Sequence, residues 1–320
     1  MRTNSSHRRK GAFSLIEILV SISILVLIVS ILSALSLETS QIWMLSKAQN
    51  ERRATGRALL QIIARDLEMA VVPGSYPSGN ATGANLQFVA NDAATIPSSL
   101  LNPHAAFWQA PVAADRSRGE LAEIGYFVRW DTQSQPGLAK AQLCRLEIDP
   151  TDTANYQIYS TNTDGTPASW LSLSTINQVA PATAATDYKG WFADNVIAIW
   201  IRCLDSQGKP IVQTAANVTL NSGYGFDSRQ GYLNPSTSLA QSGPAFPASI
   251  DLALVTVDSH TARLITAPIV ASPGSPANFG KDASTPGSLA NFMATLPNNI
   301  KPGAQFFSTR IYLKSSQRNP

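Results

Sequence analysis

The sequence predicts an α+β fold in which a long N-terminal helix precedes a mostly antiparallel β-sheet domain. An uncharged apolar run covers residues 18–37, and an amphipathic pattern of helical period follows it. Beyond these, short segments alternate between apolar and polar residues, as strands with two different faces do. With 320 residues, of which 44% are hydrophobic and 14% charged, the chain is long enough to bury a sizeable core.

The apolar run is long enough to cross a membrane, because about twenty residues of helix span the roughly 30 Å hydrocarbon core. Four basic residues precede it and residues 1–12 contain no acid; the four are Arg2, Arg8, Arg9 and Lys10. Basic residues beside a first membrane segment stay in the cytoplasm, so we expect everything after about Leu37 to lie outside. The chain has 24 basic and 21 acidic side chains, so removing these four reverses the net charge and leaves no basic stripe for nucleic acid.

The stretch "GAFSLIE" at residues 11–17 places one carboxylate, Glu17, in the first turn of the apolar run. A carboxylate is costly in hydrocarbon, so it indicates a function. A plain membrane anchor explains everything except Glu17. A secretory signal peptide would be cut near Ala34-Leu35-Ser36, but its apolar segment is normally only about 7–15 residues long. A prepilin signal is cut before the apolar run, which the mature protein keeps.

The stretch "AFSLIEIL" resembles the type IV prepilin signature of a small residue, then Phe, then four residues ending in Glu. The resemblance implies that prepilin peptidase cuts between Ala12 and Phe13 and that Phe13 is then N-methylated. The usual residue before the cut is Gly, whereas here it is Ala12, with Gly11 one place earlier. The resemblance also implies that Glu17 meets the protonated N-terminus of a neighbouring subunit and sets the assembly register. The alternative is an interfacial carboxylate that reaches the lipid headgroups.

The helix is expected to continue to Ala70, because residues 38–70 contain no Pro and a single Gly, Gly56. Apolar residues recur there every four positions, at Leu59, Ile63 and Leu67, and the arginines fall mostly off this stripe: Arg52, Arg53, Arg57 and Arg65. Pro73-Gly74 would end the helix. The predicted organisation is therefore a leader (1–12), a transmembrane and assembly helix (13–37), its periplasmic continuation (38–72) and a globular head (73–320).

Residues 73–85 and 91–119 are rich in Pro, Gly, Ser, Ala and Asn, and we expect loops there. The alternation in "EIGYFVRW" predicts a strand, which "AQLCRLEI" would join as a hairpin partner through the turn-like "QSQPG". Further strands are expected at "NVIAIWIRCLD", "ASIDLALVTVD" and "FFSTRIYLK", and a short helix at "SLANFMATL".

Several of these segments resemble the J-type minor pseudopilins of type II secretion. They are "RALLQIIARDLEMA", the "EIGYFVRW" and "LCRLEI" pair, and "WFADNVIAIWIRCLDSQG" followed by "FPASIDLALVTVD". A narrower resemblance, to the Verru_Chthon cassette protein C family, is carried by "ADNVIAIWI", "FDSRQGY", "FPASIDLALVTVD" and "FFSTRIYL". Both resemblances imply a pilin-like fold with the helix packed on the head.

The sequence indicates little catalytic chemistry. It contains no HExxH, CxxC, GxSxG, P-loop or GxGxxG motif, and we expect no cofactor and no metal site. Asp258-Ser259-His260 contains the residue types of a catalytic triad, but neighbours on an extended chain point apart, so we expect a polar turn at a strand end. In "FDSRQGY", Asp227 and Arg229 are candidates for a local ion pair or for a contact with a neighbouring subunit.

Cys144 and Cys203 both fall in predicted strands. Cys203 shares an apolar face with isoleucines, which favours a buried free thiol, although an exported location permits a disulfide.

Together these observations predict a minor pilin-like subunit and not an enzyme. It would be anchored in the inner membrane with its head in the periplasm, and its partners would be prepilin peptidase, membrane lipid and other pilin or pseudopilin subunits. The alternative is a membrane-anchored periplasmic binding or adhesion protein that does not polymerise. A secreted enzyme is a third possibility, which the missing catalytic motifs disfavour.

Overall fold

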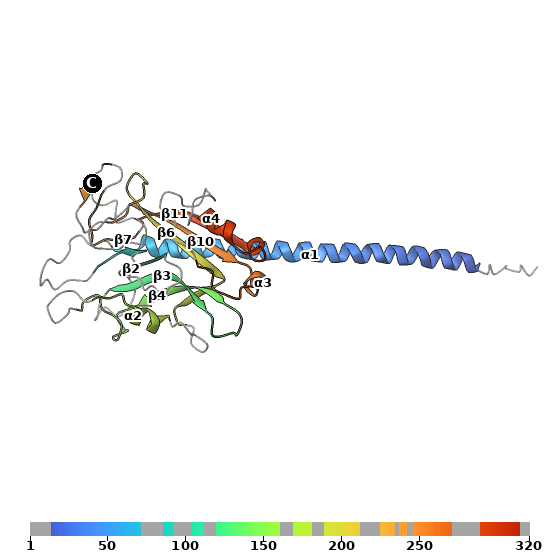
Figure 1. Cartoon of the computed structure of the whole chain (residues 1–320), viewed down its shortest axis with the longest axis horizontal. Coiled ribbons are helices and arrows are strands. Elements are labelled where there is room, and N and C mark those ends of the chain that lie inside the picture. Colours follow the sequence, from blue (N-terminus) through green and yellow to red (C-terminus); the bar gives the residue numbers. More distant parts are fainter. Residues whose placement is uncertain are drawn as a thin grey trace, which may run out of the picture. The chain divides into compact units, whose positions relative to one another are not determined.

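The computed structural model describes residues 14–71, 86–91, 104–111, 120–160, 169–180, 189–211, 225–233, 237, 239–241, 246–270 and 289–313. One helix of 54 residues, α1 (Leu15–Glu68), opens this part of the chain, and strands predominate after it (Figure 1). By internal contacts the chain divides into two units, Met1–Asn50 and Glu51–Pro320. The second unit, called the head below, therefore includes the last turns of α1.

The larger sheet of the head has six strands in the order β5-β4-β3-β2-β1-β7. Their bounds are β1 Val89–Ala90, β2 Ala105–Pro111, β3 Leu121–Asp131, β4 Lys140–Ile148, β5 Trp191–Asp194 and β7 Phe226–Asp227. Strands β2, β3 and β4 follow one another as an antiparallel meander, and β3 pairs with β4 from Glu123↔Ile148 to Asp131↔Lys140. This hairpin is the one that the sequence predicts.

A second sheet has the order β11-β10-β6, with β6 Val196–Leu204, β10 Ser249–Val257 and β11 Ala304–Tyr312. These are the three further strands expected from the sequence, and both pairings are antiparallel. A two-stranded ribbon joins β8 (Tyr232–Leu233) to β9 (Ala240–Gln241). The long helix followed by antiparallel sheets confirms the predicted α+β class and is consistent with a pilin-like fold.

Short helices complete the described part of the head: α2 (Leu173–Val179), α3 (Ser259–Ala262), α4 (Leu289–Thr295) and the 3₁₀ turn η1 (Lys301–Gly303). Helix α4 is the short helix expected at "SLANFMATL". It packs on the second sheet through Phe292, whose ring centroid lies 4.9 Å from that of Trp200.

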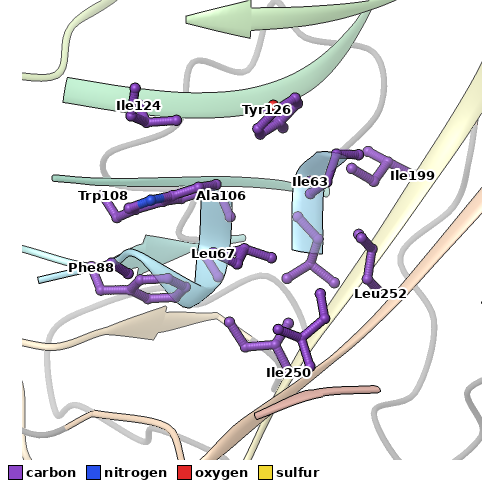
Figure 2. Close-up of a cluster of buried hydrophobic side chains, with 14 of the residues drawn as sticks. Ile63, Leu67, Phe88, Ala106, Trp108, Ile124, Tyr126, Ile199, Ile250 and Leu252 are labelled. Carbon is purple, nitrogen blue, oxygen red and sulfur yellow. The ribbon is translucent and has the colours of Figure 1, made fainter. Parts of the chain in front are cut away.

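The main hydrophobic core joins α1 to both sheets. Ile63 and Leu67, each only 1% exposed, belong to one cluster with Tyr126 of the first sheet and Leu252 of the second. Figure 2 shows these α1 side chains between residues of the two sheets. The predicted apolar stripe of the helix is thus its core-facing side, since burying such side chains is the main favourable term in folding.

Three expectations need correction. Helix α1 ends at Glu68, two residues early, because the amides of Met69 and Ala70 bond to carbonyls three residues back. The segment 91–119 is not all loop, because β2 lies in it between its two neighbours in the sheet. Arg52, which was expected to lie off the apolar stripe, is on the buried side of α1 and is only 8% exposed.

Candidate assembly site

Glu17 lies in the first turn of α1 and is exposed in the single chain. Its amide bonds to the carbonyl of Ser14 at 3.0 Å, and its carbonyl accepts from the Ser21 hydroxyl at 2.8 Å. A carboxylate in the first turn complements the partial positive charge of a helix N-terminus. The structure therefore holds Glu17 in regular helix with its side chain accessible. Ala12 and Phe13, the predicted processing residues, lie outside the described residues.

The apolar surface beside Glu17 is uncovered. Large apolar side chains from Leu15 to Leu37 are 47–81% exposed, and none of them is in the core. Within the described part of the chain, α1 is the one helix long and apolar enough to cross a membrane, with a mean hydropathy of 2.9 over its most apolar window. A contiguous apolar surface of this size is unfavourable in water, so lipid or other helices must cover it.

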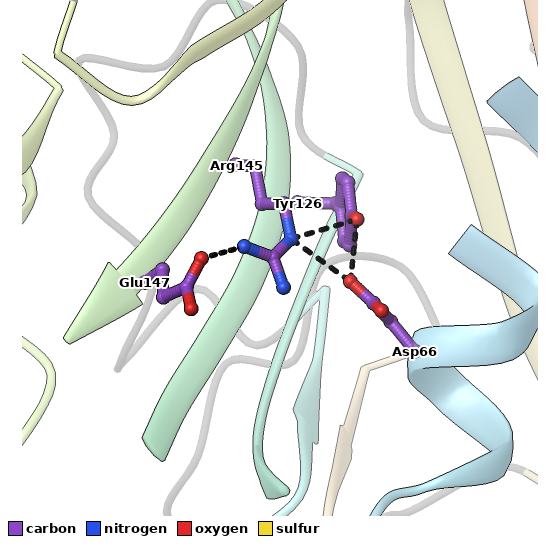
Figure 3. Close-up of polar contacts among 4 residues, drawn as sticks. All are labelled: Asp66, Tyr126, Arg145 and Glu147. Carbon is purple, nitrogen blue, oxygen red and sulfur yellow. Dashed lines mark hydrogen bonds and ion pairs between the residues drawn. The ribbon is translucent and has the colours of Figure 1, made fainter. Parts of the chain in front are cut away.

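The other end of α1 is joined to the larger sheet by a polar cluster that the sequence analysis missed (Figure 3). Asp66 accepts a hydrogen bond from the Tyr126 hydroxyl at 2.7 Å and one from Arg145 Nε at 2.9 Å. Arg145 also pairs with Glu147 through its Nη1. The one signal in the sequence is Asp66 itself, an acid beside Leu67 on the apolar side of the helix.

This cluster keeps its polar groups satisfied in a mostly buried place. Burial and the hydrogen bond to Asp66 raise the pKa of Tyr126, so its hydroxyl stays protonated and donates. The side chain of Asp66 is 11% exposed and that of Arg145 is 22% exposed. Because Asp66 of the helix is the acceptor that Tyr126 and Arg145 of the sheet share, the cluster fixes the helix to the sheet.

A second junction joins α1 to the other sheet. Arg52 Nη1 lies 3.2 Å from the carbonyl of Pro302, to which it donates, and 3.6 Å from Asp258 Oδ2. One turn later Gly56 lies against the Phe307 ring of β11, so close that an added Cβ would lie 2.3 Å from ring carbons. The only glycine of the helix is therefore the position at which it approaches this strand.

Asp258, considered above as part of a triad-like segment, has a structural role, and a buried histidine lies elsewhere in the head. Asp258 follows β10 and caps α3 by accepting from the amide of Thr261 at 2.7 Å, so the expected polar turn is a capped helical turn. His104 is buried, its ring centroid lies 5.5 Å from that of Trp200, and burial lowers its pKa to about 3. Among the described residues no group of His, Cys, Asp and Glu side chains suits a metal ion.

Two other local expectations concern Asp227 and the cysteines. Asp227 accepts from Gln87 Nε2 at 3.0 Å and from the backbone amide of Arg229 at 2.9 Å, so it organises its own turn. The ion pair with the Arg229 side chain and the contact with a neighbouring subunit stay predictions. Cys144 and Cys203 are free, buried thiols in separate hydrophobic clusters. Burial raises the pKa of Cys144 to about 12 and raises that of Cys203 as well, so both thiols are poor nucleophiles.

The order of features at the N-terminus is thus a basic leader, an acid in the first helical turn and an uncovered apolar helix. Residues 7–33 match the prokaryotic N-terminal methylation motif. This motif supports a type IV pilin-like precursor, which prepilin peptidase processes and which assembles with other pilin subunits. It also points to a structural subunit rather than an enzyme. The motif and the apolar helix are together consistent with membrane anchoring. No curated protein and no solved structure matches the chain significantly.

Proposed function

We propose that the chain is a minor pseudopilin-like subunit of a type II secretion or type IV pilus-like fibre. The observation that carries this proposal is the N-terminal methylation motif at residues 7–33, which continues directly into the uncovered apolar part of α1. Before assembly the helix lies in the inner membrane with the leader inside and the head in the periplasm. After cleavage between Ala12 and Phe13, the helix leaves the lipid and packs against the helices of other subunits.

The head supports a minor role over a repeating shaft role. It contains two sheets with their own covering helices, which is more than a helix needs to be held in a fibre. Both junctions of α1 hold the helix firmly to this head, so a pull on the helix reaches both sheets. The head is then the part that meets other minor subunits or cargo.

Glu17 acts in this proposal as the assembly register. Once Phe13 is the first residue, its protonated amine is a charge in a low-dielectric environment, and it needs a counter-charge from a neighbouring helix. Glu17 is accessible in the single chain, as that role requires.

The experiment is Glu17→Ala, expressed in the native host and followed by immunoblot in sheared-fibre and membrane fractions. Membrane insertion should persist, because removing a carboxylate makes the segment more apolar. Entry into fibres should fall several-fold. Glu38→Ala, which removes an exposed acid of the same helix after the apolar run, is the matched control and should enter normally.

The result also separates the alternative. A wild-type chain that never appears in the sheared fraction, even with its assembly machinery present, would be a membrane-anchored binding or adhesion protein. If wild type and Glu17→Ala entered the fibres equally, the chain would still be a fibre subunit, but Glu17 would not set the assembly register.

A further inference from the structure

Strand β11 forms one edge of the second sheet. Among the described strands it pairs only with β10, from Ala304↔Val257 to Tyr312↔Ser249, without a register shift. An edge strand leaves a row of backbone N–H and C=O groups without partners in its sheet, and such a row can pair with an extended segment of another chain. With nine residues, β11 is long enough to present several of these groups.

The hydrogen bonds at the two ends of β11 show which of its backbone groups lack partners. The amide of Leu313 donates to the carbonyl of Ala248 at 3.2 Å. At the other end, the amide of Asp258 donates to the carbonyl of Gly303, also at 3.2 Å. Bonded positions alternate along an antiparallel strand, so the odd-numbered residues between these ends bond to β10. The backbone groups of the even-numbered residues therefore point away from β10: Phe306, Ser308, Arg310 and Tyr312.

This outward row is open to a partner. All four of its residues are exposed, Phe306 by 45% and Tyr312 by 61%. None of their outward backbone groups has a hydrogen-bond partner among the described residues. The one charged side chain of the strand, Arg310, is paired with Asp251 through its Nε at 2.7 Å. The strand therefore has no lysine, proline or bulge, the features with which proteins commonly protect a sheet edge.

The other sheet edges of the described head are covered or short. On β6, the opposite edge of the same sheet, the carbonyl of Ile201 accepts from Asn91 Nδ2 at 2.8 Å, and the carbonyl of Cys203 accepts from the amide of Ile211 at 3.0 Å. In the larger sheet, the edge strand β5 has four residues beside a register shift, and β7 has two. Within the described part of the chain, β11 is thus the long strand whose outer edge is unprotected.

We propose that β11 binds an extended strand of a neighbouring, different pilin-like subunit, which adds to the outer edge of the second sheet. An extended chain is the partner that offers alternating donors and acceptors at the spacing of this row. Its side chains would lie beside Phe306 and Tyr312, which share one face, so we expect apolar residues at alternate positions of the partner. The proposal rests on the proposed fibre function and names the surface through which the head meets another subunit.

A second copy of this chain fits the edge less well than a different subunit does. Two identical edge strands that pair antiparallel are related by a two-fold axis perpendicular to the sheet. Helix α1 runs along β11, since Arg52 donates to the carbonyl of Pro302 and Gly56 lies against Phe307. The axis would therefore point the two α1 helices in opposite directions, whereas the fibre proposal anchors all subunits in one membrane. A different subunit, present beside a single minor copy, avoids this conflict.

Amide hydrogen exchange tests the contact, because strand addition protects every second amide. Exchange in residues 304–313 is measured by mass spectrometry with electron-transfer fragmentation, on the full chain in detergent and in sheared fibres from the native host. In detergent the outward amides, such as that of Ser308, should exchange about tenfold faster than the paired amides of Phe307 and Thr309. In fibres the outward amides should slow by about tenfold and the paired ones should not change. Equal exchange in the two states would overturn the proposal.

A proline on the edge gives an independent test. Ser308→Pro removes one outward N–H and should keep the ladder to β10, because that N–H points away from it. The variant should enter sheared fibres several-fold less than wild type. Ser308→Thr, which keeps the N–H and suits a strand, is the matched control and should enter normally. If Ser308→Pro does not fold by circular dichroism, Phe306→Lys, a charge on the same edge, replaces it.

Photo-cross-linking identifies the partner. Benzoylphenylalanine in place of Tyr312 should give, in fibres, an adduct with another pilin-like subunit, and adding Ser308→Pro should abolish it. The same probe at Tyr159, which is 50% exposed and lies outside the second sheet, is the control and should not give this adduct. An adduct with a second copy of this chain, or with a secreted protein, would overturn the proposal.

The two proposals fail in different ways. A wild-type chain that is present in sheared fibres with β11 unprotected would overturn the strand contact and keep the proposed function. A wild-type chain that is absent from the fibres would overturn both.

Discussion

The carboxylate of Asp66 on α1 accepts a hydrogen bond from the hydroxyl of Tyr126 on β3 at 2.7 Å. Arg145 on β4 donates to the same carboxylate oxygen and also to the Tyr126 hydroxyl, at 3.0 Å. One carboxylate of the helix thus joins two neighbouring strands. This fixes the end of the helix on the sheet by directional hydrogen bonds, which add to the non-directional apolar packing of Ile63 and Leu67.

Asp66→Ala should lower the free energy of unfolding of the head by about 2–3 kcal/mol, because it leaves a guanidinium and a phenol partly buried without their acceptor. Chemical denaturation of the full chain in detergent, followed by tryptophan fluorescence, measures this change. Tyr126→Phe is the control and should cost only about 1 kcal/mol, since Arg145 keeps its ion pair with Asp66. A loss under about 0.5 kcal/mol for Asp66→Ala would show that the cluster does not hold the helix.

Gly56→Ala should destabilise the head, although alanine normally stabilises a helix by about 1 kcal/mol relative to glycine. The added Cβ would lie 2.3 Å from Phe307 ring carbons, so the helix and β11 would have to separate. We expect a net loss of about 1–3 kcal/mol by the same denaturation assay. Combining Gly56→Ala with Phe307→Leu, which removes the ring, should recover part of that loss. A stabilised Gly56→Ala single variant would mean that the helix does not approach the strand this closely.

Glu123 should make the stability of the head depend on pH. Burial raises its pKa from 4.5 to about 8, with a smaller contribution from the charge of Asp152. The stability that the protonated acid contributes is therefore fully present below about pH 4.5 and is lost as pH rises through about 8, at roughly 1.4 kcal/mol per unit of pKa shift.

Glu123→Gln tests this directly, because it keeps the shape and removes the titration. Thermal unfolding at pH 5.5 and pH 8.5 should show a smaller decrease for the variant than for wild type, and the variant should be the more stable at pH 8.5. Identical pH dependence in the two proteins would assign the effect to another group.

Much of the head was predictable because its longer strands are either alternating or continuously apolar, and both patterns are local. The β3–β4 hairpin, β6, β10, β11 and α4 all carry their pattern locally. Strand β2 was missed because Ala105, Ala106 and Ala110 carry little strand preference and the surrounding residues are typical of loops. The side of β3 that carries Glu123 and Arg129 looks polar in the sequence, yet both are buried.

The junctions of α1 could not be predicted for a different reason. Residues Arg52 and Asp258 are distant in the sequence, and their contact depends on how the helix lies on the second sheet, which no local pattern records. Gly56 was noted only as the one glycine in the helix, because its role depends on Phe307 of β11. The N-terminal motif, by contrast, is read entirely from neighbouring residues.

The central claim is that the chain is a processed pilin-like subunit, and mass spectrometry of its mature N-terminus tests it most directly. The protein is purified from membranes of its native host, digested, and its N-terminal peptide sequenced. We predict a peptide that begins at Phe13 with a methylated amine, because the basic leader precedes α1 and "AFSLIE" runs into its first turn, within the matched methylation motif. A mature protein that keeps Met1 to Ala12, or one that begins at Leu37 after signal peptidase cleavage, would contradict the claim.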